Sequence, residues 1–322
     1  MANVAPLISV VFTSYNHERY LKQAVDSLIG QTFKDFELII IDDCSTDNSR
    51  TILQSYAQHP NVKLNLLEKN TGSYVKSSHL GALKATGKYI LFAQCDDFSE
   101  SEQLAVLAEK ALQFPSAGVI FSKSRLIDQD GKNLGDDYQI RNMSFKKRCK
   151  SDTLLQGQEM RSFLSYACVI PNLSAALINR DLYFKSGGLP EKFSMAADWA
   201  LWLALSELTD FFYVSEVLNN FRQHAATIRS KTKLDKQLSE ILNVFTEHSL
   251  KFRLNKTQQN AMMVGFGSIW FNYFLEDPRN AKASIIDFYK KASVEHKHLL
   301  YYLMKGAFKK TGFIIENLSN TK

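Results

Sequence analysis

The chain has 322 residues, of which 45% are hydrophobic and 22% are charged, as is typical of a globular protein with a sizeable core. It contains no uncharged apolar stretch near the roughly 18 residues that span a bilayer, and it begins without the basic region of a signal peptide, so we expect a cytoplasmic protein. Residues 231–322 carry 15 Lys and Arg against 8 Asp and Glu, a net charge of +7, which predicts an acidic partner surface for this part of the chain alone.

Strand and helix patterns alternate over the first 120 residues or so. The predicted strands are 7–12, 36–41, 62–67, 88–93 and 117–122, and the predicted helices between them are 18–30, 46–58, 75–85 and 101–114. Such alternation predicts a mostly parallel sheet with helices on both faces. In open sheets of this kind, ligands bind beyond the carboxyl ends of the strands.

The pattern loosens after residue 122. A basic segment at 141–150 is expected to be a loop, either a lid near a substrate or a plain solvated surface. A helix is predicted at 198–208 and a strand returning to the site at 211–224, and the chain from about residue 232 reads as helices. The four cysteines include no CxxC pair, which argues against a zinc ribbon or a redox site.

Two pairs of adjacent carboxylates end predicted strands of this sheet. Asp42-Asp43 follows the second strand and Asp96-Asp97 the fourth, while the polar run at 13–16 follows the first. Each pair alone is consistent with a solvated turn. Together they would place much negative charge in one crevice, which a Mg²⁺ or Mn²⁺ ion bound to one pair would offset, leaving the other pair to hydrogen-bond a polar ligand.

Two further segments offer catalytic side chains, each with a plainer alternative. Asp198 precedes an apolar helix, where it either favours the helix dipole or acts as a general base. His224 is either a surface or core histidine or a metal or phosphate contact, with Arg222 or Arg229 adding positive charge. No GxxxxGK[ST] or GxGxxG motif is present, which disfavours P-loop hydrolysis and dinucleotide-dependent redox chemistry.

Read together, these stretches resemble the family 2 glycosyltransferases, inverting enzymes with the GT-A fold. The resemblance covers about residues 5–230, and the C-terminal helices lie outside it. The stretches that carry it are "PLISVVFTSYNHERYLKQAVDSLIGQTFKDFELIIIDDCSTDNS", "NTGSYVKSSHLGALKATGKYILFAQCDDF", "GGLPEKFSMAADWALWLAL" and "FRQHAATIRS". It implies an α/β fold, a Rossmann-like, mostly parallel mixed sheet with helices on both faces, followed by a C-terminal helical region.

At the nucleotide end of the site, the resemblance implies five contacts. Thr13, Tyr15 and Asn16 match the loop that contacts the nucleotide. Asp43 matches the aspartate that hydrogen-bonds the base, typically uracil, and Asp42 lies beside it near the ribose. The implied donor is therefore a nucleotide sugar, in the first place a UDP-sugar.

At the reacting end, the resemblance implies a metal and a base. Asp96 and Asp97 match the DXD-type metal motif, with Asp97 expected as the direct ligand and Asp96 on the nucleotide side. Asp198 matches the catalytic base, and His224 matches a histidine near the metal and the diphosphate. Mn²⁺ or Mg²⁺ is the expected cofactor.

The chain departs from the family pattern at several positions. Ala197 stands where an acidic residue usually precedes the base, and Cys95 precedes the acidic pair. Ser78-His79 replaces a usual Arg-Asn, and we expect Lys76 to supply the lost positive charge next to the nucleotide. The departure at Ala197 bears on acceptor binding more than on donor binding.

These expectations define a transferase of hexosyl or N-acetylhexosaminyl groups in polysaccharide or lipopolysaccharide biosynthesis. Residues 1–230 would form the catalytic domain, with nucleotide-sugar binding in about 5–121 and the acceptor part in about 122–230, and residues 231–322 a basic helical region. The acceptor would be a glycan or a lipid-linked glycan, and no nucleic-acid partner is expected. The basic helices include an interfacial pattern at 297–314. Two partners are open for them: an anionic membrane, at the inner face of the plasma membrane, or a second copy of the chain in a homodimer.

Two other function classes remain open. An inactive homologue that binds sugar nucleotides or acts as a scaffold would be supported by loss of the metal pair or the base, but both are present. A sugar nucleotidyltransferase would have a Gly-rich loop after its first strand, and "FTSYNHE" has none.

Overall fold

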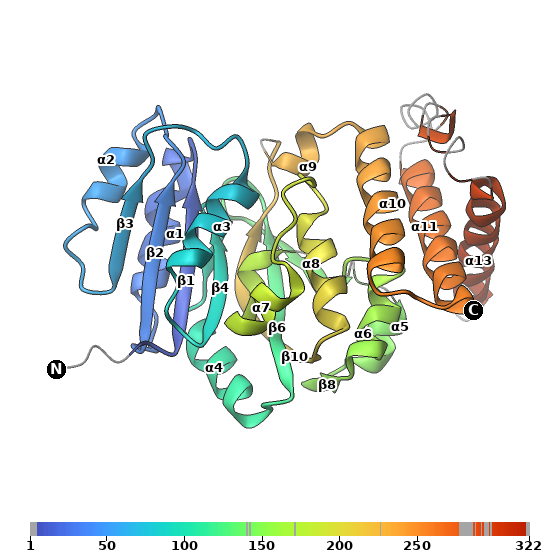
Figure 1. Ribbon diagram of the computed structural model, residues 1–322, viewed down its shortest axis with the longest axis horizontal. Helices are drawn as coiled ribbons and strands as arrows, with labels where there is room; N and C mark the ends of the chain where they lie inside the picture. Colours follow the sequence, from blue (N-terminus) through green and yellow to red (C-terminus); the bar gives the residue numbers. More distant parts are fainter. Residues whose placement is uncertain are drawn as a thin grey trace. The chain divides into compact units, whose positions relative to one another are not determined.

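The computed structural model describes residues 5–139, 141, 143–170, 172–225, 227–276, 286, 288–290, 292, 296 and 298–319 (Figure 1). The chain folds as two compact units. The first comprises Met1–Met160 and Ile170–His224, and the second comprises Arg161–Val169 and Ala225–Lys322. The domain boundaries suggested by the sequence, near residues 121 and 230, stay predictions.

A mixed ten-stranded sheet forms the centre of the first unit. Its strands follow the order β3-β2-β1-β4-β9-β6-β10-β5, and β7 and β8 pair with β6 and β10. The strands are β1 (Ile8–Ser14), β2 (Phe36–Asp42), β3 (Val62–Leu66), β4 (Tyr89–Gln94), β5 (Phe98–Ser99), β6 (Ala117–Ile127), β7 (Asn133–Asp136), β8 (Thr153–Leu155), β9 (Ala176–Asn179) and β10 (Asp210–Arg222).

Helices connect most of these strands, as the alternating pattern predicted. They are α1 (Glu18–Ile29), α2 (Ser49–Gln54), α3 (Tyr74–Lys84), α4 (Gln103–Gln113), α5 (Met143–Arg148), α6 (Gly157–Leu164), α7 (Arg180–Ser186) and α8 (Ala197–Ser206), with short 3₁₀ turns at Asp137–Gln139 and Leu173–Ala175. The second unit contains α9 (Ile228–Lys231), α10 (Leu234–Lys251), α11 (Lys256–Glu276) and α13 (Leu299–Ser319). None of the helices in the described residues is both long and apolar enough to cross a bilayer.

The strand directions bring four strand ends to one edge of the sheet. β1 pairs in parallel with β2 and with β4. β9 is antiparallel to both β4 and β6, so β6 regains the direction of β4, and β10 is parallel to β6. The carboxyl ends of β1, β2, β4 and β10 therefore face the same way, although β10 follows β4 by more than a hundred residues.

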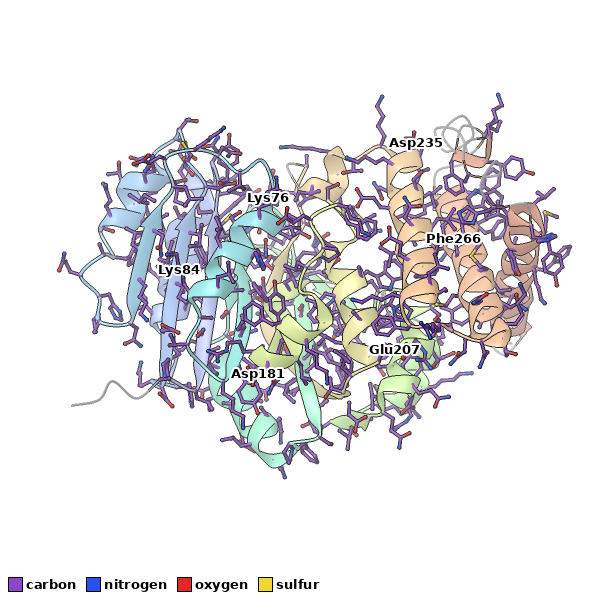
Figure 2. All side chains as sticks on the ribbon, viewed as in Figure 1. Lys76, Lys84, Asp181, Glu207, Asp235 and Phe266 are labelled. Atoms are coloured by element: carbon purple, nitrogen blue, oxygen red, sulfur yellow. The ribbon has the colours of Figure 1, made fainter. Side chains whose placement is uncertain are left out.

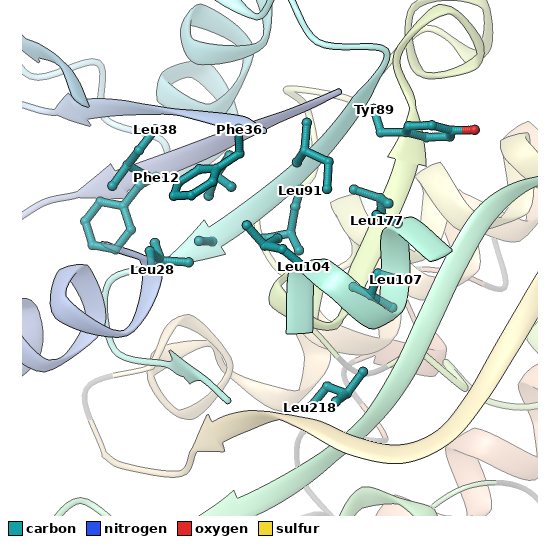
Figure 3. Packing of buried hydrophobic residues seen from close by; sticks show 14 of the residues in the cluster. Phe12, Leu28, Phe36, Leu38, Tyr89, Leu91, Leu104, Leu107, Leu177 and Leu218 are labelled. Atoms are coloured by element: carbon teal, nitrogen blue, oxygen red, sulfur yellow. The ribbon is translucent and has the colours of Figure 1, made fainter. Parts of the chain in front are cut away.

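Helices cover both faces of the sheet, as the sequence predicted. Alternate residues of β1, β2 and β4, among them Phe12, Leu38 and Leu91, form one buried cluster with Leu28 of α1 and Leu104 of α4 (Figure 3). The intervening residues point to the opposite face, because side chains alternate along a strand. There Phe92 of β4 packs against Tyr183 of α7, with ring centroids 5.1 Å apart.

The basic segment at 141–150 is not the loop that we expected. Residues 143–148 form helix α5, although residue 142 lies outside the described part of the chain. The helix is anchored by Phe145, which is fully buried between the rings of Phe121 and Tyr213 at 6.2 and 5.3 Å. Arg141 and Cys149, at the two ends of the segment, are buried as well, whereas the pattern of charges pointed to solvent.

Candidate active site

Polar residues from neighbouring strands lie in register at the common edge of the sheet. Ser14 of β1 pairs with Asp42 of β2, and Thr13 of β1 pairs with Gln94 of β4. Thr13 and Asp42 are both buried. The segments that follow β1, β2 and β4 therefore start from adjacent points at the edge where open sheets of this kind bind ligands.

A histidine–aspartate–histidine cluster lies beyond this edge. Its members are His17 after β1, Asp96 after β4 and His224 after β10, and their ligand atoms all lie within 4.8 Å of one another. Nε2 of His224 lies 3.0 Å from Oδ2 of Asp96. A carboxylate and two imidazoles, gathered from three segments, form a donor set suited to a divalent transition metal.

Hydrogen bonds define the tautomers of the two histidines. Nδ1 of His17 lies 2.7 Å from the carbonyl oxygen of Tyr15, which can only accept, so Nδ1 carries the proton and Nε2 keeps a lone pair in the neutral ring. A backbone partner of this kind orients a metal-binding imidazole. His224 donates through Nε2 to the Asp96 carboxylate, and this proton must leave before both atoms can bind a metal ion.

Asp97 is buried and held by three protein donors, and its predicted role as a metal ligand stays a prediction. Its carboxylate is 4% exposed and accepts hydrogen bonds from Arg222 N at 3.0 Å, Asn172 Nδ2 at 3.0 Å and Ser174 Oγ at 2.8 Å. Burial, followed by the charge of Asp96, raises the pKa of Asp97 to about 7, against the effect of these hydrogen bonds. Asp97 thus joins β4, β10 and the 3₁₀ turn before β9, while Asp96 lies with the two histidines.

Arg222, one of two arginines suggested as a phosphate contact, is bound by acceptors of the protein itself. Its guanidinium is buried and donates from Nε to the Asp96 carbonyl at 2.8 Å and from Nη2 to Gln23 Oε1 at 2.8 Å. Nη1 donates to the two carbonyls at 128–129, at 3.2 and 3.3 Å. The guanidinium also lies over the ring of Tyr20, 4.4 Å from its centroid. All three nitrogens of Arg222 therefore bind protein acceptors around the cluster. Arg229, the other arginine that the sequence suggested, belongs to the second unit.

Replacement of Arg222 by Lys is expected to weaken Mn²⁺ binding by about 10–100-fold, the usual effect of losing a partner that orients metal ligands. A single ammonium cannot bridge the Asp96 carbonyl, Gln23 and the 128–129 turn at once. Titration followed by the electron paramagnetic resonance of free Mn²⁺ measures this. Arg125→Lys is the matched control, since Arg125 binds Glu100 and Asn220 on the same sheet at 2.7 and 2.9 Å. Equal Mn²⁺ affinity of folded Arg222→Lys and wild type would contradict the expectation.

The Asp42–Asp43 pair is also divided between two surroundings. Asp43 is 4% exposed, and Thr71 donates to it from its backbone N–H and its hydroxyl, both at 2.7 Å. Asp42 is fully buried and accepts from the backbone N–H of Ser45 at 3.0 Å and from its hydroxyl at 2.5 Å. Both carboxylates are thus held rigidly, and each retains lone pairs beyond these bonds.

The polar run after β1 contributes one exposed ring and one internal bridge. Tyr15 is 45% exposed, which leaves its ring accessible to a planar ligand. Asn16 has a positive φ of 52°, and its side-chain oxygen accepts from the backbone N–H of Thr46 at 2.8 Å. Its own N–H donates to Ser45 Oγ at 3.0 Å, so Asn16 ties the loop after β1 to the loop after β2.

The remaining two predicted residues lie at helix starts. Lys76 is exposed in the first turn of α3, where Figure 2 labels it. Asp198 is half-buried in the first turn of α8, which has no side-chain N-cap bond, and its Oδ1 accepts from the backbone N–H of Trp199 at 2.7 Å. Asp198 is not one of the residues of the cluster.

Sequence reasoning missed His17, Thr71 and Ser45. A signal for His17 was available, since it follows directly on the polar run at the end of the first strand. Thr71 and Ser45 carried no comparable signal, because short hydroxyl side chains in loops are common and their partners are set only by the fold.

Solved structures share this fold over nearly the whole chain. The S. aureus TarS fragment 1–349 in complex with UDP-GlcNAc matches with a TM-score of 0.69 at 18% identity, covering 95% of this chain and 92% of that one. The mannosyltransferase PcManGT from Pyrobaculum calidifontis, solved with GDP-Man and Mn²⁺, matches with a TM-score of 0.55 at 15% identity, covering 95% and 87%. The sheet and its covering helices thus have the GT-A fold, and a C-terminal helical region follows them.

Sequence comparison finds a family match in the first half of the chain. Residues 9–161 match the family model described as "Glycosyl transferase family 2". The chondroitin synthase of Escherichia coli is 28% identical over 252 residues, which cover 78% of this chain. This chain spans only about a third of that relative, 34% of its length. The match to this family covers residues 9–161, just under half of the chain, and agrees with the resemblance carried by its motifs.

Proposed function

We propose that the chain is an inverting glycosyltransferase that moves a sugar from a UDP-sugar to a hydroxyl group of a glycan or lipid-linked glycan. The observation that carries the proposal is the cluster of His17, Asp96 and His224 at the sheet edge where the rigidly held Asp42 and Asp43 also lie. In this proposal Asp42 and Asp43 bind the nucleoside, and the cluster binds a cation. A nucleoside diphosphate needs both.

The cluster favours Mn²⁺ over Mg²⁺ as the cofactor. Two imidazoles and one carboxylate suit a transition metal, whereas Mg²⁺ prefers oxygen ligands and retains several waters. His17, Asp96 and His224 would hold a divalent ion, which would supply positive charge to the diphosphate and make it a better leaving group. The PcManGT complex with GDP-Man and Mn²⁺ supports this assignment by its shared fold. In this proposal Asp96 is the direct carboxylate ligand, and Asp97 holds the adjoining strands together.

The donor base and ribose are assigned to the carboxylate pair and the loop beside it. Asp43 would accept the N–H of uracil, Asp42 would lie near the ribose, and Tyr15 offers an exposed ring. Thr13 and Asn16 shape the loop, and Lys76 supplies a cation that can reach the diphosphate. The TarS complex with UDP-GlcNAc supports a UDP-linked hexose or N-acetylhexosamine as donor.

Asp198 is assigned as the general base. It would accept the proton of an acceptor hydroxyl while that oxygen attacks the anomeric carbon, and the nucleoside diphosphate leaves from the opposite face, so the configuration inverts. The relationship to chondroitin synthase supports a role in polysaccharide biosynthesis. A cytoplasmic location, a lipopolysaccharide product and a homodimer remain parts of the prediction from sequence.

Hydrolysis of a panel of nucleotide sugars, with Mn²⁺, with Mg²⁺ and with a chelator, tests the proposal. We expect release of UDP from one UDP-sugar, stronger with Mn²⁺ than with Mg²⁺ and lost with the chelator. Isothermal titration with UDP and Mn²⁺ provides the control for binding. Tight UDP binding without any hydrolysis or transfer would instead indicate a sugar-nucleotide-binding homologue, and release of pyrophosphate from a nucleoside triphosphate with a sugar phosphate would indicate a nucleotidyltransferase.

A further inference from the structure

One face of α13 is fixed against α11 by close backbone contact. A Cβ on Gly267 of α11 would lie 2.2 Å from the carbonyl oxygen of Tyr302, and a Cβ on Gly306 of α13 would lie 2.4 Å from the carbonyl carbon of Gly267. Ser268 Oγ donates to the carbonyl of Gly306 at 3.0 Å. Side chains larger than hydrogen would force the two helices apart, so the rotation of α13 about its axis is set by these glycines.

The opposite side of α13 is apolar and exposed. Leu299 and Leu303 are each 1% exposed on the packed side. Leu300, Met304 and Phe308, spaced by four residues, are 54%, 49% and 71% exposed. Tyr301 adds a ring to this face with 57% of its surface exposed. Residues four apart lie above one another on a helix, so these side chains form one continuous stripe.

Lysines border the stripe, and the helix segment that carries them has no acidic residue of its own. Lys305 and Lys309 are exposed on the next row of α13. From residue 297 to residue 315 the sequence has four lysines and no Asp or Glu. Among the described side chains, the partners of these two lysines are tyrosines: Lys305 Nζ donates to the Tyr301 hydroxyl at 3.0 Å, and Lys309 Nζ to that of Tyr166 at 2.7 Å.

We propose that this face of α13, the residues Leu300, Tyr301, Met304, Lys305, Phe308 and Lys309, docks on the surface of an anionic lipid bilayer. An interfacial helix buries its apolar stripe at the level of the headgroups while lysine stems extend beside it to the phosphates. Anionic lipid attracts basic residues near the surface, and tyrosine is favoured at this boundary. The inference is independent of the proposed transfer reaction.

Charge favours a bilayer over a second copy of the chain. A two-fold dimer through this face would set the same patch against itself, because such interfaces are isologous. Lys305 and Lys309 would then face another positive patch, and the segment 297–315 has no carboxylate to pair with them. An anionic bilayer surface avoids this repulsion between lysines, because it is acidic and also accepts apolar side chains.

Co-sedimentation of the full chain with vesicles tests the proposal. Wild type is expected to bind vesicles of phosphatidylcholine and phosphatidylglycerol at low salt, to bind less at high salt, and to bind phosphatidylcholine alone weakly. Lys305→Glu/Lys309→Glu should reduce binding to the mixed vesicles by about tenfold or more. Leu300→Ser/Met304→Ser should also reduce binding to the mixed vesicles, and the binding that remains should still weaken at high salt.

Lys84→Glu/Lys88→Glu is the matched control, because it makes the same charge change at two exposed lysines of the first unit. It is expected to bind vesicles as wild type does, and all four proteins should release UDP equally from a nucleotide sugar. Equal loss of binding in this control, or no binding by wild type, would overturn the proposal. So would a wild-type dimer in analytical ultracentrifugation that the α13 variants convert to monomers without changing vesicle binding. None of these results would bear on the transfer reaction.

Discussion

Asp198→Asn is expected to lower the rate of sugar transfer by roughly 10²–10⁴-fold, the usual contribution of a general base. The amide keeps the shape of the side chain, and its oxygen can still accept the N–H of Trp199, so the start of α8 should be preserved. What is lost is a group that can take the proton of the acceptor hydroxyl. Initial rates of transfer at saturating donor measure the effect, and calorimetry should show UDP binding within a fewfold of wild type.

A matched control for this substitution exists in the same unit. Asp181 lies in the first turn of α7, as Asp198 does in α8, but its side chain is 90% exposed. Asp181→Asn removes the same charge from the same kind of helix position and should leave transfer unchanged. If Asp198→Asn retained the wild-type rate, another residue would have to be the base, and the departure at Ala197 from the family pattern would need a different explanation.

Asp96→Asn and Asp97→Ala are expected to have opposite consequences. Asp96→Asn removes the carboxylate of the His17–Asp96–His224 cluster and should weaken Mn²⁺ binding by at least about 100-fold, more than loss of an orienting partner does. It should cost little stability, because Asp96 is partly exposed and repels Asp97. Asp97→Ala leaves three buried donors without an acceptor and should lower the free energy of unfolding by about 1–3 kcal/mol. Thermal unfolding and Mn²⁺ titration of both variants measure these effects.

The comparison of these two variants distinguishes the structural assignment from the one made from sequence. If folded Asp97→Ala lost Mn²⁺ binding while Asp96→Asn retained it, Asp97 would be the direct ligand, as the motif suggested. His224→Gln provides a second test of the cluster, since it removes one imidazole without adding a charge. It should weaken Mn²⁺ binding while leaving the contacts of Asp97 with Asn172 and Ser174 in place.

The sequence predicted the fold well where the hydrophobic periodicity of a segment agrees with the turn and capping residues at its ends. The first four strands and their helices followed from apolar runs that end in polar residues, and these ends do meet at one edge of the sheet. The long strand β10 was also anticipated, but its path was not. An antiparallel β9 between β4 and β6 has no sequence signature, since pairing is a property of the assembled sheet.

The sequence predicted which residues would lie near one another at the sheet edge, but not what each side chain would contact. Asp96 and Asp97 are neighbours after a strand, so their side chains diverge, and one joins the cluster while the other enters the protein. The sequence alone does not show which of the two adjacent aspartates joins the cluster. Arg222 presented the same difficulty, since a buried guanidinium that binds carbonyls and one that binds phosphate have the same local sequence. Burial and hydrogen-bond partners distinguish such cases, and both depend on distant segments.

The return of β10 to the edge of the sheet at which β4 also ends has a consequence for folding. Asp96 and His224 are 128 positions apart, and the segment after Asp97 pairs with β10, so the two side chains meet only once β10 has joined the sheet. Contacts of such long range form late and slowly. Binding of Mn²⁺ during refolding should therefore lag behind the recovery of the helical circular dichroism signal. A nascent chain released before β10 should fold around β1, β2 and β4 but should not bind the ion.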